Sequence, residues 1–298
     1  MGVPRLKRLL ALALFACCGL LHAEIAVVDD SGVTVRLAQP ARRIISLAPH
    51  VTESLFAIGA GDRVIGTAEY SDYPEAAKKI ARIGGYASLD LEAIVGLKPD
   101  LVIVWASGNV KAHVEKLRAM GFTLYVTEPK RIDDLPDTLA RLSQLAGTDE
   151  VGRRTVADIR RRLADLRHKY SDRPPVRTFY QIWKQPLATV GGRQIISSVI
   201  RLCGGENVFG QLKTLAPIVS VEAVIAANPE AIIASGMDEA RPEWLDDWRR
   251  WTSITAVARG NLFFVHPDLI QRHTPRLLDG AERLCHQLET ARSRRPPG

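Results

Sequence analysis

The side chains that could do chemistry are dispersed along this 298-residue chain and form no familiar catalytic motif. His266 and His273 are the closest pair of histidines, but they flank Pro267 and have no carboxylate support, which does not favour a zinc site. The run Thr189-Val190-Gly191-Gly192 is more typical of a tight turn than of a phosphate-binding loop. Nucleophile-elbow, Walker-loop and paired-histidine protease motifs are absent from the sequence. These observations predict neither an enzyme nor a metal site.

Aromatic side chains offer a different kind of chemistry, which is the burial of a large flat ligand. Tyr70, Tyr86, Trp105 and Trp183 stand at the ends of expected strands or in the loops after them, in a chain with only 6% aromatic residues. Each one alone is more often a core residue than a ligand contact. Together they predict a wide apolar cleft.

An internal repeat indicates the elements that must position these aromatics. Residues 91–104 return as residues 221–234, and each copy predicts a short helix, a stop at proline and a buried strand. Residues 54–66 likewise return as residues 198–210. The offsets of 130 and 144 residues differ by 14, so the first copy carries an insertion between positions 67 and 90. A duplicated plan predicts two similar lobes that hold something between them.

The predicted fold is α/β, with two similar lobes built on central parallel sheets and a ligand cleft between them. The N-terminal lobe is expected over residues 24–148 and the C-terminal lobe over residues 173–290. Residues 149–172 predict one long, rigid linking helix, because they contain no proline and carry an apolar stripe. Since a helix is stiffer than a coil, we expect limited hinge motion. Residues 291–298, rich in arginine and proline, predict a disordered tail.

The first 23 residues predict a secretory signal peptide, cut after Ala23, and therefore a periplasmic location. They run from three basic residues through an apolar core to Leu21-His22-Ala23. One alternative is a membrane anchor, for which the apolar core is short. Another is a lipoprotein signal, with acylation at Cys17 or Cys18.

The remaining composition is that of a globular protein, with 46% hydrophobic residues and a net charge of +7. The charge beyond the leading segment is too small and too dispersed to predict nucleic-acid binding. Cys203 and Cys285 are the two cysteines outside that segment, and in an exported protein they favour a disulfide. Such a bond would contribute about 4 kcal/mol by closing a long loop. The alternative is two separate buried thiols.

Several motifs together resemble the periplasmic substrate-binding proteins of the helical-backbone class. The similarity extends over about residues 43–288. The class includes haem and siderophore carriers, and the Ser-Asp-Tyr-Pro run is most similar to the cobalamin-binding members that serve vitamin B12 importers. The motifs are Tyr70-Ser71-Asp72-Tyr73-Pro74, Leu91-Glu92, Leu97-Lys98-Pro99-Asp100, Cys203-Gly204-Gly205-Glu206-Asn207 and Val219-Ser220-Val221-Glu222.

The resemblance implies that one glutamate on each lobe docks into a basic pocket of a permease in the inner membrane. These positions fall on Glu92 and Glu222, one in each copy of the repeat. A permease dimer with two equivalent pockets would require two equivalent carboxylates. The alternative is that both are helix N-terminal acids, favoured by the helix dipole by about 0.3 to 1 kcal/mol.

The resemblance also implies a set of positions on or beside the cleft. Ala216 stands where the family has a tryptophan, and Tyr86 where it often has one. Trp183 could restore the lost surface, or the cleft could suit a different corrinoid. His50 follows Pro49 at the cleft mouth and could reach a bound metal. The implied positions are Pro49, Tyr70, Tyr86, Trp105, Asp268 and Arg272.

The resulting hypothesis is an exported, monomeric, non-enzymatic carrier that takes up cobalamin or a related corrinoid and delivers it to an ABC importer. The corrinoid would be transported cargo, and no cofactor is expected. The alternative ligands are haem, for which the Tyr86 phenolate would be an axial ligand, and a ferric siderophore, which would favour arginines in the cleft. A secreted α/β enzyme with an unfamiliar site is the unrelated alternative.

Overall fold

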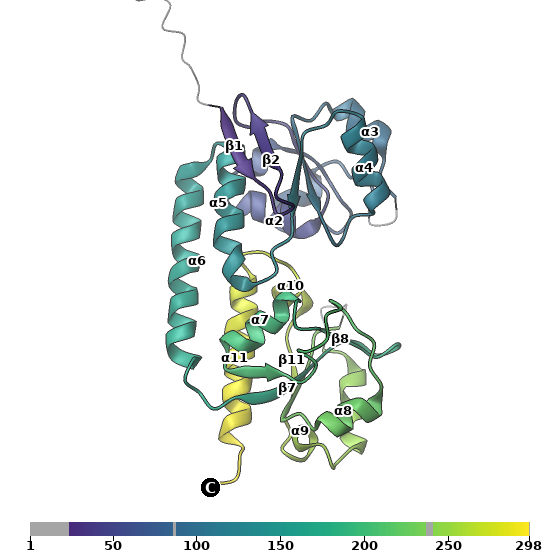
Figure 1. Cartoon of the computed structure of the whole chain (residues 1–298), viewed down its shortest axis with the longest axis vertical. Coiled ribbons are helices and arrows are strands. Elements are labelled where there is room, and N and C mark those ends of the chain that lie inside the picture. Colours follow the sequence, from purple (N-terminus) through teal and green to yellow (C-terminus); the bar gives the residue numbers. More distant parts are fainter. Residues whose placement is uncertain (1–23, 86–87, 237–240, 298) are drawn as a thin grey trace, which may run out of the picture.

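The chain folds into two α/β lobes at opposite ends of an elongated molecule (Figure 1). The computed structural model describes residues 24–85, 88–236 and 241–297. The predicted signal peptide over residues 1–23 and the predicted ligand residue Tyr86 lie outside the described residues. Within the described residues, no helix is both long and apolar enough to cross a membrane.

The N-terminal lobe is built on a four-stranded parallel sheet with the order β4-β3-β5-β6. The central strand β5 is a run of apolar residues that is buried almost to its end, as expected for a parallel strand covered on both faces. The antiparallel hairpin of β1 and β2 precedes this sheet. The strands are β1 (Ile25–Val28), β2 (Thr34–Leu37), β3 (Ile44–Ser46), β4 (Val64–Thr67), β5 (Leu101–Trp105) and β6 (Leu124–Thr127). The helices are α2 (Pro49–Ala57), α3 (Leu91–Leu97) and α4 (Lys111–Ala119), with 3-10 turns at Gly61–Arg63 and Glu75–Lys79.

The C-terminal lobe is built on a five-stranded sheet in which β7, β9, β10 and β11 pair in parallel. Only the short strand β8 is antiparallel, to β7. The strands are β7 (Val176–Trp183), β8 (Ala188–Thr189), β9 (Gly205–Asn207), β10 (Ala231–Ala234) and β11 (Leu262–Phe264). The helices are α7 (Ile195–Leu202), α8 (Val221–Ala227), α9 (Thr255–Ala258) and α10 (Pro267–Ile270), with a 3-10 segment at Glu243–Arg250.

Three helices form the backbone that connects the lobes: α5 (Leu135–Ala146), α6 (Asp149–Tyr170) and α11 (Leu277–Ser293). Figure 1 shows α6 running beside α5 and along the length of the molecule. Arg162 of α6 donates hydrogen bonds of 2.6 and 2.8 Å to Asp279 and Glu282 of α11. One hydrophobic core continues through these helices into both lobes. The predicted fold class, two lobes with central parallel sheets and a long linking helix, is confirmed.

Cys203 and Cys285 form a disulfide between the end of α7 and α11. The predicted pairing is therefore confirmed, and the alternative of two separate thiols is wrong. Both cysteines are fully buried. The bond closes a loop of 82 residues that contains most of the C-terminal lobe.

The prediction of a disordered tail over residues 291–298 is wrong for its first part. Helix α11 continues to Ser293, and the arginines after Thr290 find partners in the C-terminal lobe. Arg292 donates hydrogen bonds of 2.8 Å to the carbonyl oxygens of residues 203 and 204, and Arg295 pairs with Glu230 at 2.8 Å. An arginine-rich composition predicts disorder only where such acceptors are lacking.

Candidate ligand-binding site between the lobes

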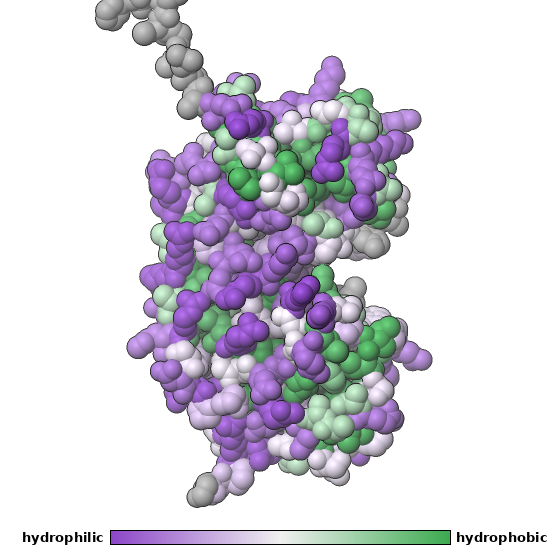
Figure 2. Space-filling view, viewed as in Figure 1, coloured by the Kyte–Doolittle hydropathy of each residue, from purple (hydrophilic) through white to green (hydrophobic). Residues whose placement is uncertain are grey.

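A cavity of about 280 Å³, open to solvent on one side, lies where the two lobes meet. Its walls come from the ends of β5 and β6 in the N-terminal lobe and from β7, the start of α7 and the segment after α10 in the C-terminal lobe. Figure 2 shows a hollow in the surface between the two lobes. The lining residues are Trp105, Ser107, Glu128, Pro129, Lys130, Ile182, Arg193, Gln194, Ile195, Ile196, Leu215, Ala216, Gln271 and His273.

Three rings from both lobes pack together at this cavity. His50 lies in the first turn of α2, Trp105 at the end of β5, and His273 after α10. The ring centroids of His50 and Trp105 are 4.9 Å apart, those of Trp105 and His273 5.9 Å, and those of His50 and His273 5.2 Å. Trp105 and His273 line the cavity, and Pro49 begins α2 beside His50. The structure thus brings three of the predicted cleft residues together, with His273 as an unpredicted fourth.

Burial keeps both imidazoles neutral at neutral pH. Burial lowers the pKa of His273 to about 4. Burial, and then the nearby charges of His273 and Arg272, hold the pKa of His50 well below its ordinary value of 6.5. Among the described residues, Nε2 of His50, Nε1 of Trp105 and Nδ1 of His273 are buried without a hydrogen-bond partner. The part of the cavity wall formed by Trp105 and His273 is therefore uncharged and aromatic.

The ring of Trp105 is held in place by the turn that follows β5. The backbone N–H of Trp105 donates a 2.7 Å hydrogen bond to the side-chain oxygen of Asn109, and the side-chain nitrogen of Asn109 donates a 2.9 Å hydrogen bond to the carbonyl of Leu47. A Cβ atom on Gly108 would lie 1.8 Å from Cε3 of Trp105. Only glycine at position 108 leaves room for this ring position.

Tyr70 lies in the predicted insertion of the first lobe but not in the wall of the cavity. Its side chain is 77% exposed, and its φ of 62° falls in the left-handed region that is uncommon for a tyrosine. The next residue holds this conformation, because Ser71 bonds to Thr52 at 3.1 Å and its carbonyl accepts from Arg82 at 2.8 Å. Tyr70 is thus presented to solvent by an ordered loop.

Arg272, predicted as a ligand contact, binds across the lobe boundary, and Asp268, also predicted as one, pairs with Arg272. Arg272 pairs with Asp72 of the first lobe at 2.9 Å and with Asp268 at 3.0 Å. Burial alone would raise the pKa of Asp72, but the hydrogen bond and charge of Arg272 lower it overall. Their neighbours Gln271 and His273 line the cavity, whereas Asp268 and Arg272 do not. In this structure Arg272 connects the lobes beside the cavity, and Asp268 pairs with Arg272 from the C-terminal lobe.

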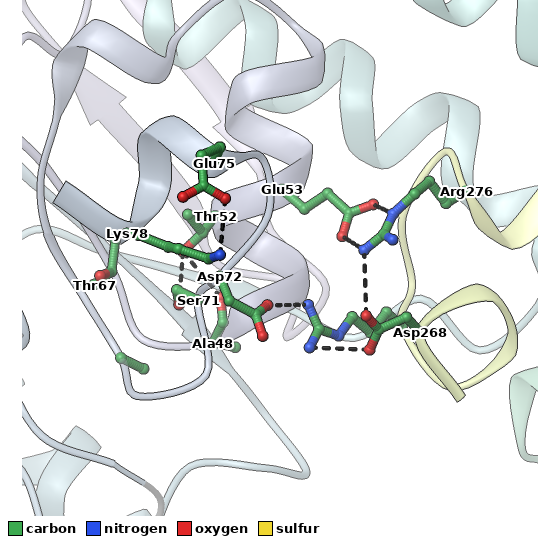
Figure 3. Close-up of polar contacts among 12 residues, drawn as sticks. Ala48, Thr52, Glu53, Thr67, Ser71, Asp72, Glu75, Lys78, Asp268 and Arg276 are labelled. Atoms are coloured by element: carbon green, nitrogen blue, oxygen red, sulfur yellow. Dashed lines mark hydrogen bonds and ion pairs between the residues drawn. The ribbon is translucent and has the colours of Figure 1, made fainter. Parts of the chain in front are cut away.

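A second pair beside them also crosses the boundary. Arg276 donates hydrogen bonds of 2.6 and 2.7 Å to the two carboxylate oxygens of Glu53 on α2. Its guanidinium also lies 3.8 Å from the ring centre of Tyr73. Figure 3 shows Glu53 facing Arg276, with Asp72 and Asp268 close by. We call Glu53–Arg276 and Asp72–Arg272 the interlobe ion pairs.

Trp183 does not take the place of the tryptophan that the chain lacks at position 216. Side chains alternate along β7, so that Ile182 lines the cavity while Trp183 is 42% exposed and bonds to the carbonyl of Gln185 at 3.1 Å. Ala216 does line the cavity, beside Leu215. The small alanine side chain leaves this wall open.

The start of α7 is a part of the site that the sequence reasoning missed. Gly191 and Gly192 lie in the predicted tight turn, in which the N–H of Gln194 donates a 3.1 Å hydrogen bond to the carbonyl of Gly191. A Cβ on either glycine would lie about 2 Å from a backbone oxygen of the adjacent loop, residues 210–214. That turn places Arg193 and Gln194 in the cavity wall. The two glycines were the only feature of the sequence that pointed to this turn. They do not indicate that the next side chains, Arg193 and Gln194, line the cavity.

Glu92 and Glu222 occupy equivalent positions on the two lobes. Each is the second residue of a seven-residue helix, α3 or α8, and each is exposed. The preceding N-cap side chains, Asp90 and Ser220, accept hydrogen bonds of 2.9 and 3.1 Å from the third residue of their helices. A backbone hydrogen bond and the Ser220 hydroxyl lower the pKa of Glu222. The two carboxylates are therefore presented in the same way.

A family model of periplasmic binding proteins matches residues 44–269. The chain belongs to the periplasmic binding protein family. Membership confirms the predicted periplasmic location and the resemblance on which the cleft and docking positions were assigned.

Several vitamin B12-binding proteins are similar to the chain over most of its length. The chain is 39% identical to a vitamin B12-binding protein of Vibrio cholerae over 253 residues, which is 85% of this chain and 91% of the relative. It is 38% identical to one of Vibrio vulnificus over 262 residues, 87% of this chain and 94% of the relative. A vitamin B12-binding protein of Yersinia pestis shares 34% identity over 84% of this chain and 88% of its own length.

Solved structures support the same family. The periplasmic vitamin B12 binding protein BtuF of Vibrio cholerae superposes with a TM-score of 0.79 at 38% identity, covering 85% of this chain and 98% of BtuF. The periplasmic haem-binding protein HutB of Vibrio cholerae gives a TM-score of 0.71 at 18% identity, covering 83% of this chain and 98% of HutB. At that identity the likeness to HutB concerns the fold alone.

Proposed function

We propose that this periplasmic binding protein captures cobalamin or a related corrinoid between its lobes and passes it unchanged to an ABC importer. The observation that carries this proposal is the cavity between the lobes, where Trp105 and His273 supply an aromatic, uncharged surface. A flat macrocycle gains most of its affinity by burying its faces against such a surface, while a few polar groups bind its amide side chains. The corrinoid is then cargo, and the protein catalyses no reaction.

The open wall at Ala216 bears on the shape of the cargo. A tryptophan at this position would fill space that alanine leaves empty in the cavity between the lobes. The insertion loop presents Tyr70 in an ordered but exposed position, so this tyrosine would contact only a ligand that extends out of the cavity. Both features support a bulky ligand that protrudes from the cavity toward the first lobe.

Docking to the permease is assigned to Glu92 and Glu222. Their equivalent placement on two exposed helix starts supports recognition by a permease dimer with two equivalent basic pockets. A single monomer presents both carboxylates, so no oligomer of the binding protein is required.

The test is ligand retention by the purified protein. The protein is incubated with cyanocobalamin or with haemin, passed through a gel-filtration column, and its absorbance spectrum is recorded. We expect the corrinoid absorbance to elute with the protein in a 1:1 ratio. A Soret band that elutes with the protein, together with loss of cyanocobalamin on the column, would instead assign the cleft to haem.

A further inference from the structure

A second cavity continues from the first along the boundary between the lobes, and its walls are strongly basic. It has a volume of about 500 Å³. The two cavities share Glu128, Lys130, Arg193 and Leu215 as lining residues, so they are adjacent parts of one cleft. We call this second part the basic groove. Its charged lining residues are five cations and the single carboxylate of Glu128.

Four of these cations have no anionic partner in the part of the chain that the structure describes. The side chains of Lys130, Arg193, Arg201 and Lys213 make no ion pair or hydrogen bond with any other described residue. The fifth, Arg131, is paired with Asp133 at 2.9 Å. The carboxylate of Glu128 already accepts hydrogen bonds of 2.8 and 2.9 Å from the backbone and hydroxyl of Ser107. Within the described residues, the groove therefore has an excess of positive charge that no carboxylate neutralises.

The solvated face of α6 has a different pattern. On α6, Arg160, Arg161 and Arg162 each pair with a carboxylate at 2.8 Å or less. The cations of the basic groove, in contrast, lie on several different segments that the fold brings together around a concavity. Like charges held close together repel one another unless an anion lies among them.

Backbone hydrogen bonds bring these cations together. Gly191 and Gly192 donate hydrogen bonds of 3.0 Å to the carbonyls of Leu215 and Leu212, which place the loop carrying Lys213 beside Arg193. On the other side, the backbone N–H of Ile132 donates a 2.8 Å bond to the hydroxyl of Ser198 on α7. That bond holds the segment of Lys130 against the helix that carries Arg201. The groove is thus assembled from both lobes and is part of the interlobe cleft.

We propose that the basic groove binds an anionic group of the cargo, namely the phosphodiester of the nucleotide loop that distinguishes a complete corrinoid from its bare macrocycle. This inference rests on the proposed function. The aromatic cavity takes the flat macrocycle, and the adjacent cations take the negatively charged phosphodiester at its periphery. Arginine and lysine at the end of flexible side chains suit a phosphate oxygen. The groove then selects corrinoids that carry the nucleotide loop.

The test compares cyanocobalamin with dicyanocobinamide, which keeps the corrin ring and lacks the nucleotide loop with its phosphodiester. The variant is Arg193→Gln combined with Lys213→Gln, and affinities are measured by calorimetry at low and high salt. We expect the variant to bind cyanocobalamin about fivefold more weakly at low salt, as for the loss of two exposed charge contacts, with a smaller difference at high salt. Its affinity for dicyanocobinamide should not change.

The matched control is Lys116→Gln combined with Arg118→Gln, which removes the same charge from two exposed positions of α4 outside the cleft. This control should bind both ligands like the unaltered protein. Equal weakening of both ligands by the groove variant, or no weakening of either, would overturn the assignment of the phosphodiester while leaving corrinoid binding intact. Failure of the unaltered protein to bind either corrinoid would sink the proposed function, and this inference with it.

Discussion

Arg276 of the C-terminal lobe binds both carboxylate oxygens of Glu53, a residue of the N-terminal lobe that is 223 positions away in the sequence, at 2.6 and 2.7 Å. Only 3% of the Glu53 side chain is exposed, so this is a largely desolvated, bidentate pair at the edge of the ligand cavity. Burial alone would lower the pKa of Arg276, but the hydrogen bond and charge of Glu53 raise it overall. The relative position of the lobes therefore depends on specific side chains as well as on the connecting helices.

Removing the charge of Glu53 should destabilise the protein. Glu53→Gln leaves Arg276 beside a neutral group in a mostly buried site, and we expect a loss of about 2 kcal/mol in the free energy of unfolding by urea. Glu150→Gln is the control, because its pair with Arg154 is more than two-thirds exposed and should change stability by less than about 0.5 kcal/mol. Equal losses in the two variants would contradict a structural role for the interlobe pair.

The buried histidines predict a loss of stability in mild acid. The pKa of His273 is about 4 in the folded chain and has its ordinary value of 6.5 once unfolded. Between these values the unfolded chain binds a proton that the folded chain does not, so stability is complete above pH 6.5 and falls as the pH approaches 4. The loss from His273 is roughly 3 kcal/mol at most, and His50 acts in the same direction.

Melting temperature measured across this pH range checks the prediction. His273→Gln should flatten the dependence, whereas His168→Gln, at an exposed position of α6, should leave it as it is. An unchanged slope in His273→Gln would mean that this imidazole is not the titrating group.

The position of the Trp105 ring should depend on Gly108. A Cβ in Gly108→Ala would lie 1.8 Å from the indole, so the ring must move, and we expect cyanocobalamin affinity to fall about tenfold. Gly96→Ala is the control, because a Cβ on Gly96 meets nothing within 4 Å. Tryptophan fluorescence and a binding titration of both variants test this; equal affinities would refute the dependence.

The docking assignment predicts separable effects on binding and uptake. Glu92→Ala combined with Glu222→Ala should leave cyanocobalamin affinity unchanged and abolish uptake by cells that carry the cognate permease. Glu115→Ala combined with Glu206→Ala changes one exposed carboxylate on each lobe and should support normal uptake. A loss of ligand affinity in the first pair would show that these glutamates belong to the cleft and not to the permease surface.

Local signals in the sequence account for what could be predicted. The repeat identified α3 with β5 and α8 with β10, because helix caps, proline stops and β-branched runs are encoded by neighbouring residues. The disulfide followed from export and from the presence of two cysteines alone. Trp105 was placed in the cleft because the end of a parallel strand faces the ligand side of an α/β sheet.

Contacts between distant residues account for what could not be predicted. Arg272 was assigned to the ligand, but its partner Asp72 lies 200 residues away, and no local pattern encodes that pairing. Arg295 was assigned to a disordered tail because its acceptor, Glu230, is equally remote in sequence. Trp183 was predicted to lie in the cleft because it stands at the end of a strand. Successive side chains of a strand point to opposite faces, however, and in this structure Ile182 faces the cavity and Trp183 does not.

The central claim is that Trp105 forms part of a cleft that binds a corrinoid. It is tested most directly by calorimetric titration of cyanocobalamin into the unaltered protein and into the Trp105→Ala variant. Thermal unfolding verifies that the variant is folded. We predict 1:1 binding to the unaltered protein and binding about ten- to a hundredfold weaker in the variant, as for loss of a central aromatic contact. Absence of binding to the unaltered protein, or equal affinity in a folded Trp105→Ala variant, would contradict it.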